Sequence, residues 1–169
     1  SNPTVLVGGQ LKRWRVVMVA IGVLGYGLDQ WTKAEAVARL DPYGPPSWFG
    51  GFLTLRLIRN PGAAFSMGST VTVLISLFAI AMLIAVCVWG VPRARHRWSL
   101  IACGMLIAGI CGNLTDRIFR APGPLRGHVV DFMSLPHFAV FNVADIFITS
   151  TAILVVVVAV FGHHEDDAG

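Results

Sequence analysis

Four long apolar runs, separated by polar segments, constrain the fold of this 169-residue chain more than any other feature. A helix needs about 20 mostly apolar residues to cross the hydrocarbon core of a bilayer. We expect four such helices, over residues 16–30, 70–91, 98–118 and 141–161. Charged residues make up only 13% of the chain, which argues against a disordered chain and against an ordinary soluble domain. The sequence therefore predicts an all-α membrane protein in which residues 1–169 form a single integral membrane domain.

Two connecting segments are too long to be simple turns. Residues 40–68 contain several Pro and Gly residues and then a stretch, residues 52–59, in which apolar and polar side chains alternate. Alternation with a period of two is typical of a half-buried strand. We therefore expect a small β-containing, extracytoplasmic platform between the first and second spans. Residues 119–140, between the third and fourth spans, are predicted to form an outward loop.

Basic residues beside the ends of spans indicate which side of the membrane is cytoplasmic. Six of the 13 lysines and arginines form two dense clusters, and these are Lys12, Arg13, Arg15, Arg93, Arg95 and Arg97. The remaining seven are spread over the other side, so the density of the clusters, and not their number, favours a cytoplasmic location for them. Four spans then place both termini in the cytoplasm. The basic residues form no stripe with interleaved aromatic residues, so we expect no nucleic-acid partner.

Four aspartates lie near the predicted outward ends of the spans, namely Asp29, Asp116, Asp131 and Asp145. A charge at the centre of a bilayer costs about 2.5–3.5 kcal/mol on insertion scales, so a retained one usually has a partner or a function. Asp131 and Asp145 are the most informative, because apolar residues surround both. Two carboxyl groups that share one proton can activate a water molecule and protonate a leaving group. The alternative is that each merely caps a helix or pairs with an arginine.

Other polar residues near these aspartates have both a structural and a functional interpretation. Asp29 and Lys33 are four residues apart, which favours an ordinary ion pair on one helix face. Asn142 precedes Asp145 by three residues, so it either shares a helix face with Asp145 or is a plain N-cap. Asn60 opens a turn that leads into the second span, or it is a hydrogen-bonding group of the site.

Small and polar residues alternate at helical spacing near the end of the third span. Gly109 and Asn113 are four residues apart, as are Gly112 and Asp116. Such a stripe is typical of tight helix packing through small residues, or it holds the acidic side chains in place. Arg117 is then a partner for Asp116 or for a neighbouring span.

Two other kinds of chemistry are weighed against an acid pair. His128, His137 and the two aspartates lack any spacing typical of a zinc site, so we expect no metal and no cofactor. A proton-coupled small membrane transporter or channel subunit is the alternative function, with the acids as a relay. It predicts acids spread through the depth of the membrane. A membrane scaffold without enzymatic activity is a third interpretation.

Five short motifs occur in one order along the chain. They are Asp29-Gln30-x-Thr32-Lys33, Asn60-x-Gly62-Ala63-Ala64-Phe65, Gly112-Asn113-x-x-Asp116-Arg117, Val129-Val130-Asp131-Phe132 and Phe141-Asn142-x-Ala144-Asp145. Each motif is short, but together with four spans they resemble the bacterial lipoprotein signal peptidases, also called signal peptidase II. The resemblance extends over residues 16–161.

This resemblance implies a four-span aspartyl endopeptidase of the bacterial inner membrane, with its active site near the outer face. Such an enzyme removes signal peptides from diacylglyceryl-modified prolipoproteins by cleaving before the lipid-modified cysteine. Asp131 and Asp145 match the catalytic pair of the family. The supporting and substrate-binding positions are Asp29, Lys33, Asn60, Gly62, Asn113, Asp116, Arg117 and Asn142. The implied partners are prolipoproteins, membrane lipids and globomycin-type inhibitors, which make the family an antibiotic target, and we expect a monomer.

Overall fold

The computed structural model describes residues 4–62 and 68–167. The elements in chain order are α1 (Gly8–Arg39), β1 (Ser47–Trp48), η1 (Phe49–Gly51), β2 (Leu53–Asn60), α2 (Ser69–Ala85), η2 (Val86–Gly90), α3 (Val91–Arg93), α4 (Arg97–Phe119), β3 (Val129–Ser134) and α5 (Val143–Asp167). The π-helical turn η2 joins α2 to α3, so that residues 69–93 form one continuous helical rod. The protein is mostly helical, with one small sheet.

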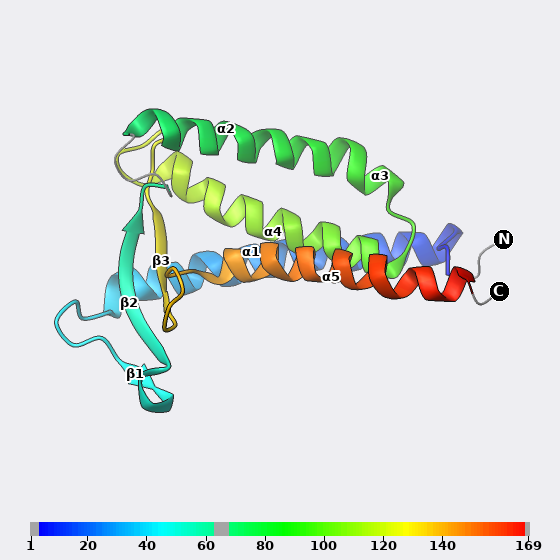
Figure 1. The fold of residues 1–169 in the computed structure, drawn as a ribbon. Helices are drawn as coiled ribbons and strands as arrows, with labels where there is room; N and C mark the ends of the chain where they lie inside the picture. The colour runs from blue at the N-terminus through cyan, green and yellow to red at the C-terminus, as the bar shows by residue number, and fades with distance from the viewer. Residues whose placement is uncertain (1–3, 63–67, 168–169) are drawn as a thin grey trace.

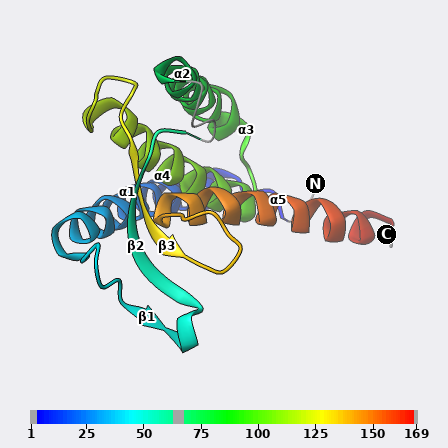
Figure 2. The same cartoon turned by 60° about the vertical axis from the view of Figure 1, so that its left-hand side comes forward.

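The helices form a bundle in which successive long helices run in opposite directions (Figure 1). α1 packs along α4, and α4 packs along both α5 and α2. The two chain ends and α3 lie at one end of this bundle, and the sheet lies across the other end (Figures 1 and 2). Residues far apart in the sequence therefore meet at the sheet end.

Three helical segments are long and apolar enough to cross a membrane, among the residues that the structure describes: Ser69–Arg93, Arg97–Phe119 and Val143–Gly162. They correspond to three of the four predicted spans and confirm that these three are helices capable of crossing a membrane. The fourth predicted span, residues 16–30, lies within α1, which extends well beyond it at both ends. The polar ends of α1 lower its apolar character, so its crossing of the membrane stays a prediction.

The sheet is antiparallel, with the strand order β1-β2-β3. The strand predicted over residues 52–59 is confirmed as β2. The prediction that residues 119–140 form only a loop is wrong, because Val129–Ser134 is strand β3. The first four residues of β3 are all buried, so the strand lacks the alternating pattern that would reveal it in the sequence. Ile58 of β2 pairs with Asp131 of β3, so this pairing positions one of the predicted catalytic residues.

Two glycines on α4 allow close helix packing near the sheet. A methyl group on Gly109 would lie 2.7 Å from the Ala144 carbonyl oxygen, at the start of α5. A methyl group on Gly112 would lie 2.9 Å from the carboxyl carbon of Asp29, on α1. These approaches agree with the packing interpretation of the small-residue stripe, and they bring three helices together beneath the sheet.

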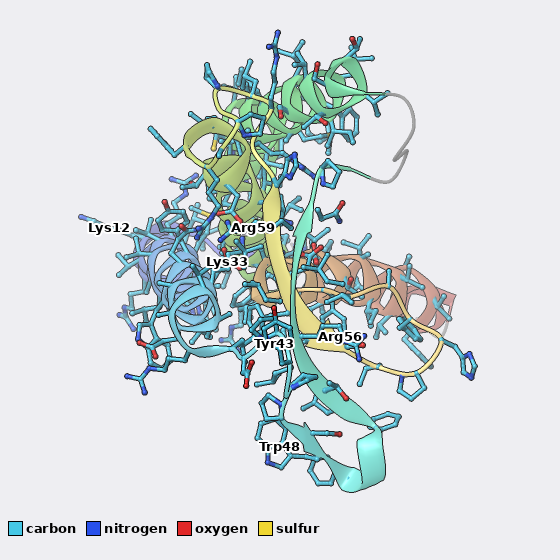
Figure 3. The ribbon with its side chains drawn as sticks, turned by 90° about the vertical axis from the view of Figure 1, so that its left-hand side faces the viewer. Lys12, Lys33, Tyr43, Trp48, Arg56 and Arg59 are labelled. Atoms are coloured by element: carbon cyan, nitrogen blue, oxygen red, sulfur yellow. The ribbon has the colours of Figure 1, made fainter. Side chains whose placement is uncertain are left out.

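The arm formed by β1, η1 and the start of β2 extends beyond the bundle. Figure 3 shows Trp48 near the tip of this arm, far from Lys33. Phe49 and Phe52 are exposed on the same arm. An exposed group of aromatic side chains on a protein with membrane-spanning helices is typical of the membrane–water interface.

Candidate active site

Polar side chains from α1, β2, α4, β3 and the start of α5 meet where the bundle joins the sheet. We call this group the polar layer, and it consists of Asp29, Gln30, Lys33, Asn60, Asn113, Asp116, Arg117, Asp131, Asn142 and Asp145. All four aspartates that the sequence places near the outward ends of spans belong to it. Their gathering at one end of the bundle differs from the spread through the membrane that a proton relay predicts.

Lys33 is the centre of one half of the polar layer. Its Nζ lies 2.8 Å from Oδ2 of Asp29 and 3.0 Å from Oδ2 of Asp116. It also donates hydrogen bonds to the Gly112 carbonyl at 3.2 Å and to Oδ1 of Asn113 at 3.1 Å. Lys33 and both carboxylates are fully buried, so each charge depends on these partners. The predicted pairing of Asp29 with Lys33 is confirmed. The ion cluster also includes Asp116 on α4, which the spacing within α1 does not indicate.

The two carboxylates around Lys33 also bind the backbone of other elements. Asp29 accepts a hydrogen bond at 2.8 Å from the Ala144 N–H, at the start of α5. Asp116 accepts one at 3.1 Å from the Val130 N–H, in β3. These bonds hold α5 and β3 against α1 and α4. The ion cluster therefore fixes the two elements that carry Asp145 and Asp131.

Arg117 has other partners than the sequence suggests. Its Nη1 donates to the backbone carbonyls of Asn60 at 2.8 Å and Gly127 at 3.0 Å. The arginine that forms an ion pair with Asp116 is Arg120, whose Nε lies 3.1 Å from Oδ1 of Asp116. Neither predicted partner of Arg117 is found among its hydrogen bonds, because they reach β2 and the loop before β3, and not Asp116 or a neighbouring span. The spacing of four residues between Asp116 and Arg120 is the signal that identifies the correct pair.

Asp131 lies on β3 with its carboxyl group held by two amides. Asn60 donates to Oδ2 at 3.0 Å, and Asn142 donates to Oδ1 at 2.7 Å. Burial raises the pKa of Asp131 to about 6, and the negative charge of Asp145 contributes to the increase. The hydrogen bonds from the two amides and the charge of Lys33 oppose it. Asp131 is thus a carboxyl group that exchanges its proton near neutral pH.

Asp145 lies in the first turn of α5. Its Oδ1 accepts a hydrogen bond from Asn113 at 3.0 Å, and its Oδ2 accepts one from the Asn142 N–H at 3.1 Å. Its own N–H donates to Oδ1 of Asn142 at 2.9 Å, so Asn142 is the N-cap of α5 in a reciprocal capping arrangement. Because Asn142 also donates to Asp131, the capping interpretation and the functional interpretation of this residue both fit the geometry.

Asp131 and Asp145 both line a cavity of 590 Å³. Its polar part is formed by these two residues together with Asn60, Asn113 and Arg117. Its apolar part is formed by side chains of α2, α4 and α5, among them Ile75, Phe78, Leu106, Ile110 and Ile148. A cavity of this size with a few convergent polar groups is typical of a ligand site. The two carboxyl groups therefore lie in a cavity whose other lining side chains are mostly apolar.

Gly62 has a position that suits only glycine. Its φ is +127°, and a methyl group there would lie 2.9 Å from Cδ1 of Ile75. Its N–H donates to Oδ1 of Asn60 at 2.9 Å, which orients the amide of Asn60 toward Asp131. The following part of the same motif, residues 63–65, lies outside the described residues.

Gln30 is a member of the polar layer for which the sequence predicts no individual role. Its Nε2 donates to Oδ2 of Asp29 and to the Gly112 carbonyl, both at 3.1 Å. The only signal in the sequence is the place of Gln30 in the first motif.

Within residues 4–62 and 68–167, no three His, Cys, Asp or Glu side chains are arranged to hold a metal ion.

Comparisons with known proteins show which family this chain resembles. Residues 19–161 match the family model described as signal peptidase II. The lipoprotein signal peptidase of Mycobacterium tuberculosis H37Rv is 42% identical over 153 residues, which cover 90% of this chain and 75% of that protein. The lipoprotein signal peptidase of Mycobacterium avium strain 104 is 44% identical over 159 residues, covering 94% and 86%.

A solved structure of a bacterial membrane enzyme, determined by the in meso method at 1.9 Å resolution, is similar with a TM-score of 0.73 and 28% identity. The match covers 85% of this chain and 92% of that one. The family model and the identity to the two mycobacterial proteins lead to the same assignment. This chain belongs to the signal peptidase II family.

Proposed function

We propose that this protein is an aspartyl endopeptidase that removes signal peptides from diacylglyceryl-modified prolipoproteins, cleaving before the lipid-modified cysteine. Membership of a signal peptidase family makes peptide-bond hydrolysis the reaction. The observation that carries the catalytic assignment is that Asp131 and Asp145 line one cavity and are bridged by Asn142. Two carboxyl groups in a largely apolar cavity are the pairing that aspartic proteases use.

The environment of the two acids supports a division of roles. Asp131, with its pKa raised to about 6, is the group that holds the shared proton. Asp145 is then the ionised base, which accepts a proton from water as the water oxygen attacks the scissile carbonyl carbon. The protonated Asp131 donates a hydrogen bond to the developing oxyanion. Asp145 then gives the proton that it took from water to the peptide nitrogen, and the C–N bond breaks as the carbonyl re-forms. The amine leaves with that proton, and the hydroxyl group of the water stays on the acyl product.

The walls of the cavity support a substrate that arrives from the bilayer. Apolar side chains of α2 and α5, such as Phe78 and Ile148, face the same space as the two acids. The acyl chains and the apolar part of a signal peptide remain among such side chains, while the scissile bond lies at the polar layer. Globomycin-type inhibitors occupy the same space in this proposal. The protein acts as a monomer and needs no cofactor.

α1 is the fourth span in this proposal, because it runs along α4 through the length of the bundle (Figure 1). The basic residues at the start of α1 and around α3 lie at the end opposite the sheet. Basic residues at one end favour a cytoplasmic location for both termini. The sheet and the polar layer then lie at the outer face of the bacterial inner membrane.

The test is cleavage of a diacylglyceryl-modified precursor by purified wild-type protein and by Asp131→Asn and Asp145→Asn variants. Each substitution removes one participant in proton transfer, so we expect kcat to fall by between about 100-fold and 10,000-fold. Asp41→Asn is the matched control, because Asp41 is an exposed aspartate whose Oδ1 accepts a hydrogen bond from the Tyr43 N–H, away from the cavity. Near-normal turnover in either of the first two variants would contradict the assignment.

A further inference from the structure

A second hollow lies at the end of the bundle away from the polar layer. Its volume is 490 Å³, and side chains from the α2–η2–α3 rod, from the start of α4 and from α5 line it. We call it the distal groove, and the lining residues used here are Met82, Ala85, Trp89, Arg93, His96 and Val155. Met82 and Leu106 line both this groove and the acid-containing cavity, so the two hollows are neighbours.

The distal groove is apolar along its length and basic at its end. Arg93 is exposed there, with its guanidinium carbon 4.6 Å above the ring of Trp89. Among the described residues, Arg93 makes one hydrogen bond, from Nη1 to the Trp89 carbonyl at 3.2 Å. A guanidinium has five N–H donors, so most of them are free to bind an anion. His96 and Trp98 line the same end, and a tryptophan at a helix end is typical of the headgroup level of a membrane.

The π-helical turn η2 is a second unusual feature of this groove. It occupies Val86–Gly90, near the C-terminal end of the α2–η2–α3 rod. Its first and last residues, with Trp89, line the groove. Single π-helical turns within helices occur frequently at functional sites. Here the turn leads directly into the helical end that carries Arg93.

We propose that the distal groove binds one anionic phospholipid, with an acyl chain along the apolar walls and the phosphate beside Arg93 and His96. Arginine binds phosphate oxygens through two parallel N–H groups, and basic pockets between spans bind anionic headgroups. A signal peptide fits this end of the groove less well, because its N-terminal region is positively charged and meets Arg93. The combination of apolar walls with a cationic end therefore selects an anionic lipid.

The first test measures lipid retention by native mass spectrometry of the full chain in detergent. The probes are phosphatidylglycerol and phosphatidylcholine with identical acyl chains, so that only the headgroup charge differs. We expect the wild type to retain phosphatidylglycerol at least about fivefold more than phosphatidylcholine, from about 1 kcal/mol for each basic side chain near the headgroup. Arg93→Gln removes most of this preference. Arg95→Gln is the matched control, because Arg95 is exposed two residues away but does not line the groove, and it leaves the preference unchanged.

The second test fills the groove instead of changing its charge. Ala85 lines the groove and is exposed to it, whereas the neighbouring Ile84 is 57% exposed and does not line it. Ala85→Phe is expected to lose phosphatidylglycerol retention, and Ile84→Phe is expected to keep it, while both unfold at the wild-type temperature in lipid-free detergent.

Two results would overturn the proposal. Equal retention of the two lipids by the wild type would mean that no headgroup is selected. An equal loss in Arg93→Gln and Arg95→Gln would mean that the basic end attracts anionic lipids in general, without a site.

Discussion

The polar layer contains two pairs of aspartates whose charges are balanced in different ways. Asp29 and Asp116 are both fully buried and both contact Nζ of Lys33, at 2.8 and 3.0 Å. Asp131 is only 3% exposed, yet its carboxyl group is held by the neutral amides of Asn60 and Asn142. The first pair has a cation between its members, and the second pair has a cavity.

This difference separates a structural pair from the pair that we propose to be catalytic. Buried carboxylates that contact an ammonium group depend on that contact, because removing either partner leaves the other charge unpaired in the interior. Amide donors stabilise a carboxylate less than a cation does, so the pKa of Asp131 remains near 6. Asp29 and Asp116 hold the backbone of α5 and β3 in place, whereas Asp131 and Asp145 line the cavity and contact no lysine or arginine within the described residues.

The largest expected effect comes from removing the cation of the first pair. Lys33→Met leaves two buried carboxylates without their shared partner, which costs about 3–5 kcal/mol of the free energy of unfolding. Lys12→Met is the control, because Lys12 is an exposed lysine near the start of the same helix. Unfolding in detergent, followed by circular dichroism, measures both. If the two variants unfold alike, the ion cluster does not brace the fold.

The next effect concerns the pH dependence of the second pair. The folded-state pKa of Asp131, about 6, lies above its unfolded value of 3.8, so the folded protein binds more protons between these values. The contribution of Asp131 to the free energy of unfolding is therefore fully present below about pH 4 and falls by about 3 kcal/mol as the pH rises through 6. The Asp131→Asn variant lacks this dependence. Parallel unfolding curves for the wild type and the variant from pH 4 to pH 7.5 would contradict it.

A smaller effect tests how closely the first pair is packed. A methyl group at Gly112 would lie 2.9 Å from the carboxyl carbon of Asp29 and 3.0 Å from Cβ of Ala144. Gly112→Ala therefore forces α1 or α5 to move, at a cost of about 1–3 kcal/mol in the free energy of unfolding. Gly27→Ala is the opposite case, because Gly27 lies on α1 with open space where a methyl group would go. It gains about 0.5–1 kcal/mol from helix propensity. A gain in both variants would contradict the packing described for Gly112.

How far the fold is predictable from sequence depends on whether a segment has a local pattern. The apolar runs predict residues 70–91 and 98–118 to within a few residues of the observed helices, because lipid-facing helices need an apolar surface along their length. Residues 31–39 continue α1 without such a run, and Lys33 and Ala36 are buried there against other elements. β3 becomes a strand by pairing with β2, about 70 residues earlier in the chain, and no local pattern reports that pairing.

The contacts of the candidate site also differ in whether local spacing predicts them. The contacts of Asp29 with Lys33, and of Asn142 with Asp145, follow from spacing within one helix. The hydrogen bond from Asn60 to Asp131 joins two strands, and its existence depends on the register of the sheet. Local spacing therefore predicts the pairs within an element, whereas the resemblance between motifs is what groups the residues of different elements. The catalytic and supporting roles of these residues stay predictions.

The last prediction concerns a shift in a pH profile and refines the description of the second pair. Asn60→Ala removes one of the two amide donors to Asp131, so the carboxylate is less stabilised and the pKa of Asp131 rises further. A hydrogen bond to a charged group is worth about 1.5–3 kcal/mol, which corresponds to an increase of at least about one pH unit. Because the protonated form of Asp131 is the active one in the proposed mechanism, the alkaline limb of the kcat/KM profile moves to higher pH by that amount.

Thr54→Ala is the matched control for this change, since Thr54 lies on the same strand and bonds Ser47 instead of the polar layer. Its pH profile is expected to coincide with that of the wild type. If instead the acid limb moved to higher pH and the alkaline limb stayed in place, Asp131 would be the base, because a base is active only when it is deprotonated. The proton would then belong to Asp145, and the roles of the two acids would be exchanged while the pair itself remained.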